Sequence, residues 1–426
     1  MRSLSLSNRT GDPSVAALFT DGESTFRNAK LRPLTQIAYK AFADAAGKGS
    51  LLVITLVAAR RLSPWAFGVF GLGTALGWML AVIADFGIQM HVARAVARVP
   101  DAAALLLARW WRVRTLATAV AVGILTLLLL MWRADAGMVV PLLGFAVAYA
   151  STSLVEFLNY FYRGLSRSDI ESTLTIAQRT ATLVLAVAVL IWRPGVTALA
   201  LAMLLPAIAT ALWSARIAAR LRPPATGLAI PSDSFVRDVF PIGLGIVLSA
   251  LYFRIDVVLV ELWVGTEAVA SYNAVFRVVD ALRLFPAAVL AVILPSLCTA
   301  SSLKPVARVS IALTAFGAAV AVVLWSTADR LVPLLFGERY AGAVPTLRIL
   351  ALSFPLLSLN LALTHQLVGW NRQRAYAAIC AIALVVNLTL NAWLIPAFSI
   401  DGAAWATLGT ELCLTGGCAA ALWVRS

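Results

Sequence analysis

The sequence predicts an all-α polytopic membrane protein of about 12 transmembrane helices. Of its 426 residues, 61% are hydrophobic and only 13% are charged. A soluble domain cannot bury that much apolar surface, whereas helices of about 20 apolar residues span a bilayer. The formal net charge of +14 comes from arginines scattered in ones and twos between apolar segments. That pattern is typical of membrane topology signals, and we therefore expect no nucleic-acid partner.

Twelve apolar segments are the predicted spans, and most are separated by short polar or basic connections. The third predicted span follows Arg114 and ends near Trp132, and residues 91–108 before it are expected to form a basic connection. The other spans are predicted at residues 34–58, 66–90, 138–161, 172–192, 196–217, 239–262, 268–297, 307–325, 345–368, 375–395 and 403–424.

The spans divide into two lobes of six helices. Residues 1–33 are polar, without the apolar run of a signal peptide, and are expected to form a cytoplasmic tail. Residues 34–220 form the predicted N-terminal lobe, 221–237 a cytoplasmic linker, and 238–426 the C-terminal lobe. An even number of spans gives both lobes the same orientation. We therefore expect a pseudo-twofold axis along the membrane normal and a cavity at the lobe interface.

Basic residues are unevenly distributed between the two sides of this topology. With the N-terminus inside, the cytoplasmic side carries about threefold more Lys and Arg than the other side. Arg112 and Arg114 belong to the cytoplasmic set in this assignment, and Arg60, Arg61 and Arg339 to the opposite set. Both termini are therefore expected to be cytoplasmic.

The first, seventh and eighth predicted spans each contain both basic and acidic residues away from their ends. Charged residues are costly in hydrocarbon, by about 2.5–3.5 kcal/mol or more near its centre. Such residues usually face a bundle interior or a wet cavity and mark a function. The basic members are the candidate substrate-binding residues: Lys40, Lys48, Arg254, Arg277 and Arg283. The acidic members are the candidate ion-coupling residues: Asp44, Asp256 and Asp280.

Guanidinium groups bind phosphate oxygens through two hydrogen bonds, and a dry cavity strengthens the attraction. The basic set therefore predicts binding of an anionic headgroup such as a pyrophosphate. The acidic set is where a proton or sodium gradient would couple to transport. A local alternative pairs Arg254 with Asp256 and Arg277 with Asp280 at i, i+3.

Nothing in the sequence indicates a catalytic or metal centre. The four cysteines lie in or beside apolar segments without metal-ligand spacing, and His91 and His365 are far apart in sequence. We therefore expect no metal, no cofactor and no enzymatic activity.

Several short motifs carry a resemblance to a known family. Ala84-Asp85-Phe86-Gly87 lies at the end of the second predicted span, Tyr252-Phe253-Arg254-Ile255-Asp256 lies in the seventh, and Leu335-Phe336-Gly337-Glu338-Arg339-Tyr340 precedes the tenth. Ser271-Tyr272-Asn273-Ala274 with Arg277, and Leu284-Phe285-Pro286, lie in the eighth. In order and spacing they resemble the Wzx-type flippases, in the polysaccharide-transporter branch of the MOP superfamily that also holds the MATE drug exporters.

This resemblance implies a MOP/MATE-like fold and alternating access by two lobes. The implied substrate is a polyprenol-pyrophosphate-linked oligosaccharide, flipped across the cell inner membrane for O-antigen, capsule or exopolysaccharide assembly. Membrane lipids and polysaccharide polymerase and chain-length proteins are the implied partners. By position, Arg254 and Arg277 match the family's basic cavity residues, with Lys40 or Lys48 as first-helix counterparts.

Two other functions stay open on the sequence. A MATE-like cation-coupled drug antiporter would have a mainly acidic cavity, whereas the charges here are mostly basic. A membrane-embedded O-antigen polymerase or ligase would have a long extracytoplasmic loop bearing Arg or His, and the loops between these spans are short.

Overall fold

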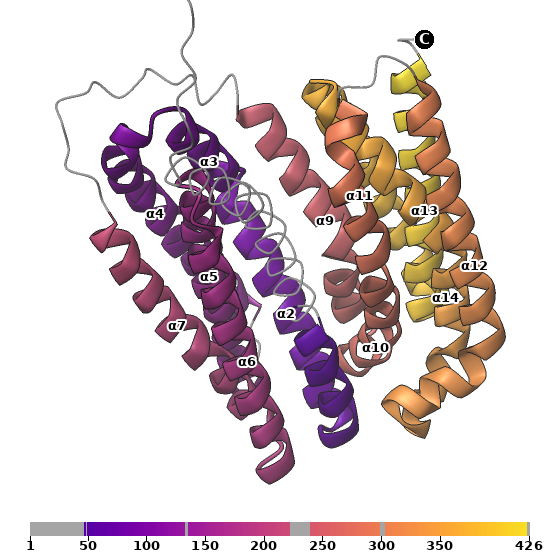
Figure 1. The fold of residues 1–426 in the computed structure, drawn as a ribbon. Coiled ribbons are helices and arrows are strands. Elements are labelled where there is room, and N and C mark those ends of the chain that lie inside the picture. Colours follow the sequence, from indigo (N-terminus) through magenta and orange to yellow (C-terminus); the bar gives the residue numbers. More distant parts are fainter. Residues whose placement is uncertain (1–46, 48, 133–134, 222–238, 299–302, 424–426) are drawn as a thin grey trace, which may run out of the picture.

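The computed structural model describes residues 47, 49–132, 135–221, 239–298 and 303–423. Within these ranges the chain is helical nearly throughout and contains no β-strand. Residues 49–61 are helical and precede the labelled helices of Figure 1. The labelled helices are α2 (Pro64–Asp85), α3 (Ile88–Arg98), α4 (Ala103–Met131), α5 (Ala136–Gly164), α6 (Ser168–Trp192), α7 (Val196–Arg220), α9 (Phe240–Trp263), α10 (Thr266–Leu282), α11 (Leu284–Cys298), α12 (Leu303–Phe336), α13 (Val344–Gly369) and α14 (Gln373–Trp423). Two 3₁₀ turns, η1 (Pro100–Ala102) and η2 (Glu338–Ala343), precede α4 and α13.

These helices account for the predicted spans and confirm a polytopic all-α membrane protein. Nine helices in the described part of the chain are long and apolar enough to cross a membrane. One of them, α14, contains two predicted spans, because its backbone leaves the helical region at Ser399 (φ 54°, ψ −133°). The eighth span is divided between α10 and α11, and the first is described only in its second half. The predicted tail at 1–33 lies outside the described residues, as does nearly all of the linker at 221–237.

The prediction of one continuous helix over 66–90 is wrong, because α2 ends at Asp85. Phe86 and Gly87 both have left-handed backbone conformations (φ 46° and 77°). The carboxylate of Asp85 accepts hydrogen bonds from the backbone N–H groups of Gly87 (3.1 Å) and Gln89 (3.3 Å). These bonds satisfy donors at the start of α3, where helical partners are lacking. The predicted connection at 91–108 is consequently formed by most of α3, by η1 and by the first turns of α4.

The predicted helix over 268–297 is likewise two helices, with Arg283 between them. Pro286 explains the break, because proline has no N–H to donate to the carbonyl of Leu282 one turn earlier, and its ring crowds that carbonyl. The interruption places Arg283 at the end of α10, halfway through the apolar segment.

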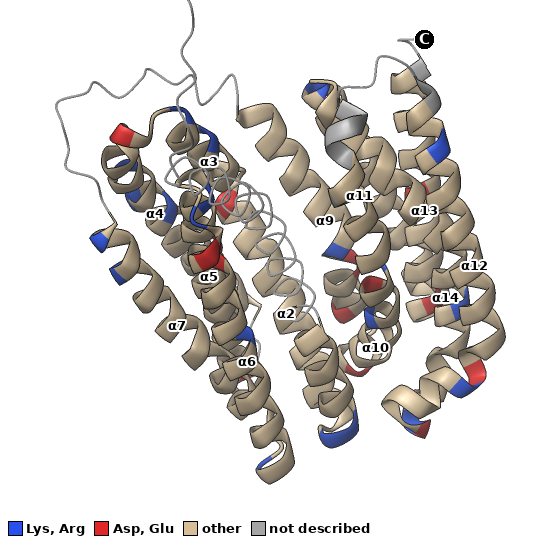
Figure 2. Cartoon of the chain, viewed as in Figure 1, with Lys and Arg blue, Asp and Glu red and all other residues tan. Residues whose placement is uncertain are grey.

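Two groups of helices lie side by side in Figure 1, α2 to α7 in indigo to magenta and α9 to α14 in pink to yellow. One hydrophobic core joins the groups, since buried residues of both belong to it, among them Phe70 of α2 and Tyr272 of α10. Gly68 shows how closely these two helices approach, because an added Cβ would lie 1.9 Å from the carbonyl oxygen of Thr266. Figure 2 shows charged residues near many helix ends and a further set within the C-terminal group around α10.

Two arginines join the groups at the end of the molecule where α2 begins. Arg60 Nε donates to the carbonyl of Leu335 in the last turn of α12 (3.1 Å). Arg339 donates to the carbonyls of Leu62 (2.9 Å) and Ala59 (2.6 Å) at the end of helix 49–61. Carbonyls in the last turn of a helix lack helical partners and attract positive charge. Each arginine therefore caps a helix of the other half, and we refer to this pair of side chains as the arginine clasp.

Candidate functional site

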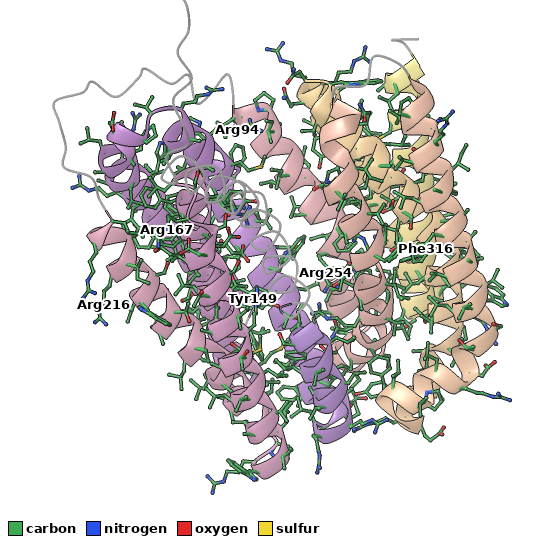
Figure 3. All side chains as sticks on the ribbon, in the orientation of Figure 1. Arg94, Tyr149, Arg167, Arg216, Arg254 and Phe316 are labelled. Carbon is green, nitrogen blue, oxygen red and sulfur yellow. The ribbon has the colours of Figure 1, made fainter. Side chains whose placement is uncertain are left out.

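A cavity of about 450 Å³ lies between the two groups of helices. The N-terminal half contributes residues of helix 49–61, Thr74 of α2 and Tyr149 of α5. The C-terminal half contributes three of the predicted basic residues and one predicted acidic residue: Arg254, Arg277, Arg283 and Asp280. Figure 3 labels Tyr149 and Arg254, which come from opposite groups and line this central cavity. The structure thus brings together four candidates that lie on α9, α10 and the junction with α11.

Arg277 connects the two halves across the central cavity. Its Nη2 donates to Thr74 Oγ1 of α2 at 3.1 Å, and its Nη1 lies 3.4 Å from Asp280 Oδ2 on its own helix. The side chain is only 7% exposed, and its buried Nε has no hydrogen-bond partner among the described residues. The predicted i, i+3 pair with Asp280 is therefore present, and it leaves part of the guanidinium unused.

Arg254 and Arg283 contact aromatic rings in the central cavity. The guanidinium carbon of Arg254 lies 4.6 Å from the ring centre of Phe276, and that of Arg283 lies 4.2 Å from the ring centre of Phe253. Arg254 is 4% exposed, and its Nη1 is buried without a hydrogen-bond partner among the described residues. A ring face stabilises a cation without removing its charge or occupying its N–H donors in the plane. Both guanidinium groups therefore keep donors for an anion.

Asp256 does not line the central cavity. Its carboxylate accepts hydrogen bonds from the hydroxyl of Tyr272 and from the backbone N–H of Val257 (2.8 Å). Among the described contacts, Asp256 bonds to α10 through Tyr272 and forms no ion pair with Arg254, so the predicted local pair is wrong. A spacing of two residues on a helix separates side chains by about 200°, which explains why the two point in different directions. The remaining candidates, Lys40, Asp44 and Lys48, lie outside the described residues.

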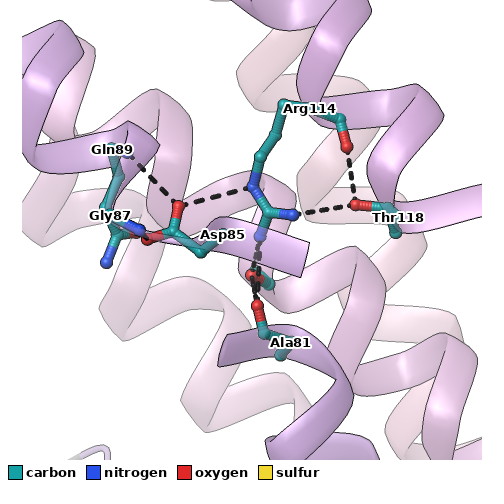
Figure 4. Close-up of polar contacts among 7 residues, drawn as sticks. Ala81, Asp85, Gly87, Gln89, Arg114 and Thr118 are labelled. Atoms are coloured by element: carbon teal, nitrogen blue, oxygen red, sulfur yellow. Dashed lines mark hydrogen bonds and ion pairs between the residues drawn. The ribbon is translucent and has the colours of Figure 1, made fainter. Parts of the chain in front are cut away.

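A buried polar network in the N-terminal half was not anticipated from the sequence (Figure 4). Arg114 of α4 is fully buried, and its Nε lies 3.5 Å from Asp85 Oδ1. Its other nitrogens donate to Thr118 Oγ1 (3.0 Å), to Ser153 Oγ and to the carbonyl of Ala81 (3.4 Å). Arg114, which the sequence assigns to the cytoplasmic side just before the third predicted span, therefore lies inside the helix bundle and not in an exposed connection. One sequence feature pointed to this network: an acidic residue, Asp85, lies near the end of one predicted span, and a basic residue, Arg114, lies just before the next.

A second buried network connects α13 with the last part of α14. Asn360 Nδ2 donates to Glu411 Oε2 at 2.6 Å, and Thr415 Oγ1 donates to Asn360 Oδ1 at 2.8 Å. Both Asn360 and Glu411 are buried. The structure gives both residues an interhelical bond.

A family model described as polysaccharide biosynthesis protein matches residues 35–301, and one described as MatE matches residues 241–393. A probable low-salt glycan biosynthesis flippase of Haloferax volcanii is 29% identical over 195 residues. That match covers 43% of this chain and 41% of the other protein, so the chain spans about two fifths of that relative.

Solved structures are similar over nearly the whole chain. A MATE structure in the bent conformation has a TM-score of 0.64 at 16% identity and covers 92% of this chain and 95% of the other. A MOP superfamily transporter from Pyrococcus furiosus has a TM-score of 0.61 at 16% identity with the same coverages. The lipid II flippase MurJ in an inward closed conformation has a TM-score of 0.57 at 11% identity, covering 91% and 87%. These similarities confirm the MOP/MATE-like fold.

Proposed function

Because the chain belongs to the family of polysaccharide biosynthesis proteins, whose model matches more than half of it, we propose that it is a flippase for lipid-linked glycans. It is a multi-pass membrane transporter of the MOP superfamily. The similarity to a probable glycan biosynthesis flippase supports a glycan as the cargo.

The observation that carries this proposal is the charge of the central cavity. Its described lining contains three arginines and a single carboxylate, Asp280. An anion entering between the lobes would meet Arg254 and Arg277, both of which have unused buried donors. Arginine binds phosphate oxygens through two parallel hydrogen bonds, and the apolar surroundings strengthen that attraction. A pyrophosphate group between lipid and sugar fits this site.

Arg277 gives the cavity a way to couple binding to lobe movement. Its bond to Thr74 joins α10 to α2 across the interface. A phosphate that recruits the guanidinium would compete for this donor and weaken the bond between the lobes. The substrate would thereby lower the cost of the conformational change that carries it across, as alternating access requires.

The finer assignments extend the same proposal. The cargo is a polyprenol-pyrophosphate-linked oligosaccharide repeat unit for O-antigen, capsule or exopolysaccharide, flipped across the cell inner membrane. The lobes comprise residues 34–220 and 238–426, both termini are cytoplasmic, and polymerase and chain-length proteins take over the product. A proton or sodium gradient drives the cycle through Asp44, Asp256 or Asp280. Lys40 and Lys48 add positive charge to the binding site.

A MATE-like antiporter is the second candidate, because the MatE model matches residues 241–393. Its cationic cargo would be repelled by the three cavity arginines, which favours the flippase. An O-antigen polymerase or ligase ranks third.

The deciding experiment is deletion of the gene followed by extraction of polyprenol-linked saccharides from each face of the membrane. A completed repeat unit that accumulates on the cytoplasmic face supports the flippase. Repeat units that accumulate outside would contradict it in favour of a polymerase or ligase. Unchanged glycans would contradict it in favour of the antiporter.

A further inference from the structure

A second cavity, of about 330 Å³, lies among the helices of the N-terminal half. Its described lining differs from that of the central cavity, because half of its residues have neutral hydrogen-bonding side chains. They come from the start of α3, from α5 and from α6: Gln89, Thr152, Asn159, Tyr160, Thr175 and Gln178. The described lining also includes two arginines and two glutamates, and within it only Gly47 and Val155 lack a polar side chain.

The charged groups among the described lining residues are paired with one another. Arg163 Nε donates to Glu171 Oε2 at 2.7 Å, and Arg179 Nη2 lies 3.9 Å from Glu156 Oε1. In this described lining two arginines are thereby balanced by two glutamates. A positive ligand would meet both guanidinium groups and a negative one both carboxylates, so these four residues favour neither sign of charge. The capacity for new hydrogen bonds lies in the neutral side chains.

One of those side chains is buried with an unused acceptor. Asn159 is 5% exposed; its Nδ2 donates to Thr175 Oγ1 (3.3 Å), whereas its Oδ1 has no partner among the described residues. The Oε1 atom of Gln89 is likewise buried without a hydrogen-bond partner among the described residues. A buried acceptor left without a hydrogen bond is destabilising. A ligand that brings O–H or N–H donors into this cavity would supply that hydrogen bond.

The two cavities lie about one helical turn apart along two different helices. On α5, Tyr149 lines the central cavity and Thr152 lines the second one. In helix 49–61, Leu51 lines the central cavity, and Gly47, four residues earlier in the chain, lines the second one. One turn of α-helix rises about 5.4 Å. The two cavities are therefore close enough for one ligand to reach both.

We propose that the second cavity binds the sugar next to the diphosphate of the lipid-linked glycan, and that this sugar is uncharged. The inference rests on the proposed flippase function and adds a sugar subsite to it. Sugar hydroxyls donate and accept at once, which matches a lining of amides and hydroxyls. The unused oxygens of Gln89 and Asn159 accept from such hydroxyls. The pyrophosphate stays in the central cavity near Arg254 and Arg277.

The test compares short-chain lipid probes bound to the purified full-length protein. The probes are farnesyl diphosphate, farnesyl diphospho-N-acetylglucosamine and farnesyl diphospho-glucuronic acid. We expect the neutral sugar to raise the affinity of the wild type over farnesyl diphosphate by about tenfold, and Asn159→Leu and Thr175→Val to remove most of that gain. Binding of farnesyl diphosphate itself should not change in these variants.

Asn387→Leu is the matched control, because Asn387 is also a buried amide that donates to a threonine on a neighbouring helical segment (Thr410 Oγ1, 3.1 Å) and lines neither cavity. An equal loss in this control, no gain from the neutral sugar in the wild type, or a larger gain from glucuronic acid would each overturn the sugar subsite while leaving the flippase proposal standing. Failure of all three probes to bind the wild type would instead remove the flippase proposal.

Discussion

Arg114 of α4 and Asp85 at the end of α2 form an ion pair inside the N-terminal half, with Nε 3.5 Å from Oδ1. The same carboxylate accepts from the backbone of Gly87 and Gln89, where the chain turns into α3. The pair therefore fixes both the end of one helix and the direction of the next. Because Gln89 also lines the second cavity, the pair helps to fix the position of one of that cavity's lining residues.

Replacing Arg114 should destabilise the fold strongly. Arg114→Met leaves the carboxylate of Asp85 buried without its cation, and breaking a buried pair in this way costs about 3–5 kcal/mol. The measurement is the free energy of unfolding in titration with sodium dodecyl sulfate. Arg112→Met is the matched control, since Arg112 is exposed two residues away, and should change the free energy of unfolding by no more than about 0.5 kcal/mol. Equal effects in the two variants would contradict the assigned role.

Arg277 should be required for glycan export but not for membrane insertion. In Arg277→Ala the central cavity loses a phosphate donor and its bond to Thr74, and export should fall about tenfold or more. The readout is surface glycan per unit of protein in the membrane fraction. Arg216→Ala, at an exposed position of α7, should export normally. Near-normal export by Arg277→Ala would remove this residue from the binding site.

The arginine clasp should control the opening of one edge of the lobe interface. Arg60→Ala combined with Arg339→Ala removes both helix caps, so the two halves should separate more often at this edge. The measurement is the distance distribution between spin labels at positions 61 and 338, in a background without the four native cysteines. We expect the double variant to have a larger population at long distance than the wild type. Arg330→Ala, which removes an exposed arginine of α12, should show no such increase. An unchanged distance distribution in the double variant would show that the arginine clasp does not hold the two lobes together at this edge.

Gly68 should resist even the smallest side chain. The added methyl group of Gly68→Ala would overlap the carbonyl of Thr266, where the ideal Cβ lies 1.9 Å from the oxygen. Overpacking of this kind costs about 1–3 kcal/mol. Gly123→Ala is the matched control, because nothing lies within 4 Å of its added Cβ and alanine favours a helix by about 0.5–1 kcal/mol. We expect Gly68→Ala to lower the free energy of unfolding and Gly123→Ala to raise it. A decrease of equal size in both variants would contradict the close approach of α2 to Thr266.

The orientation in the membrane can be tested with two reporter fusions. In Figure 1 helices α12 and α7 end at opposite ends of the molecule. Gly337 directly follows α12, and Arg220 is the last residue of α7. With cytoplasmic termini, alkaline phosphatase fused after Gly337 should be active, and the same fusion after Arg220 should be inactive. The reverse pattern would invert the topology.

Hydropathy predicted where the chain is helical but not where helices break. Mean hydropathy stays high across both helix breaks and therefore does not locate them. The end of α2 depends on the hydrogen bonds of the Asp85 carboxylate, and the break between α10 and α11 depends on Pro286. Charged positions inside spans pointed to the central cavity, since Arg254 and Arg277 both line it. The same rule failed for Asp256, because sequence spacing does not reveal the Tyr272 hydroxyl that faces it.

The arginine clasp has no carboxylate in it. Its described acceptors are all backbone carbonyls, those of Leu334, Leu335, Ala59 and Leu62. The acceptor side cannot be deleted by changing a side chain, so a mutational scan for loss of closure would detect only the two arginines.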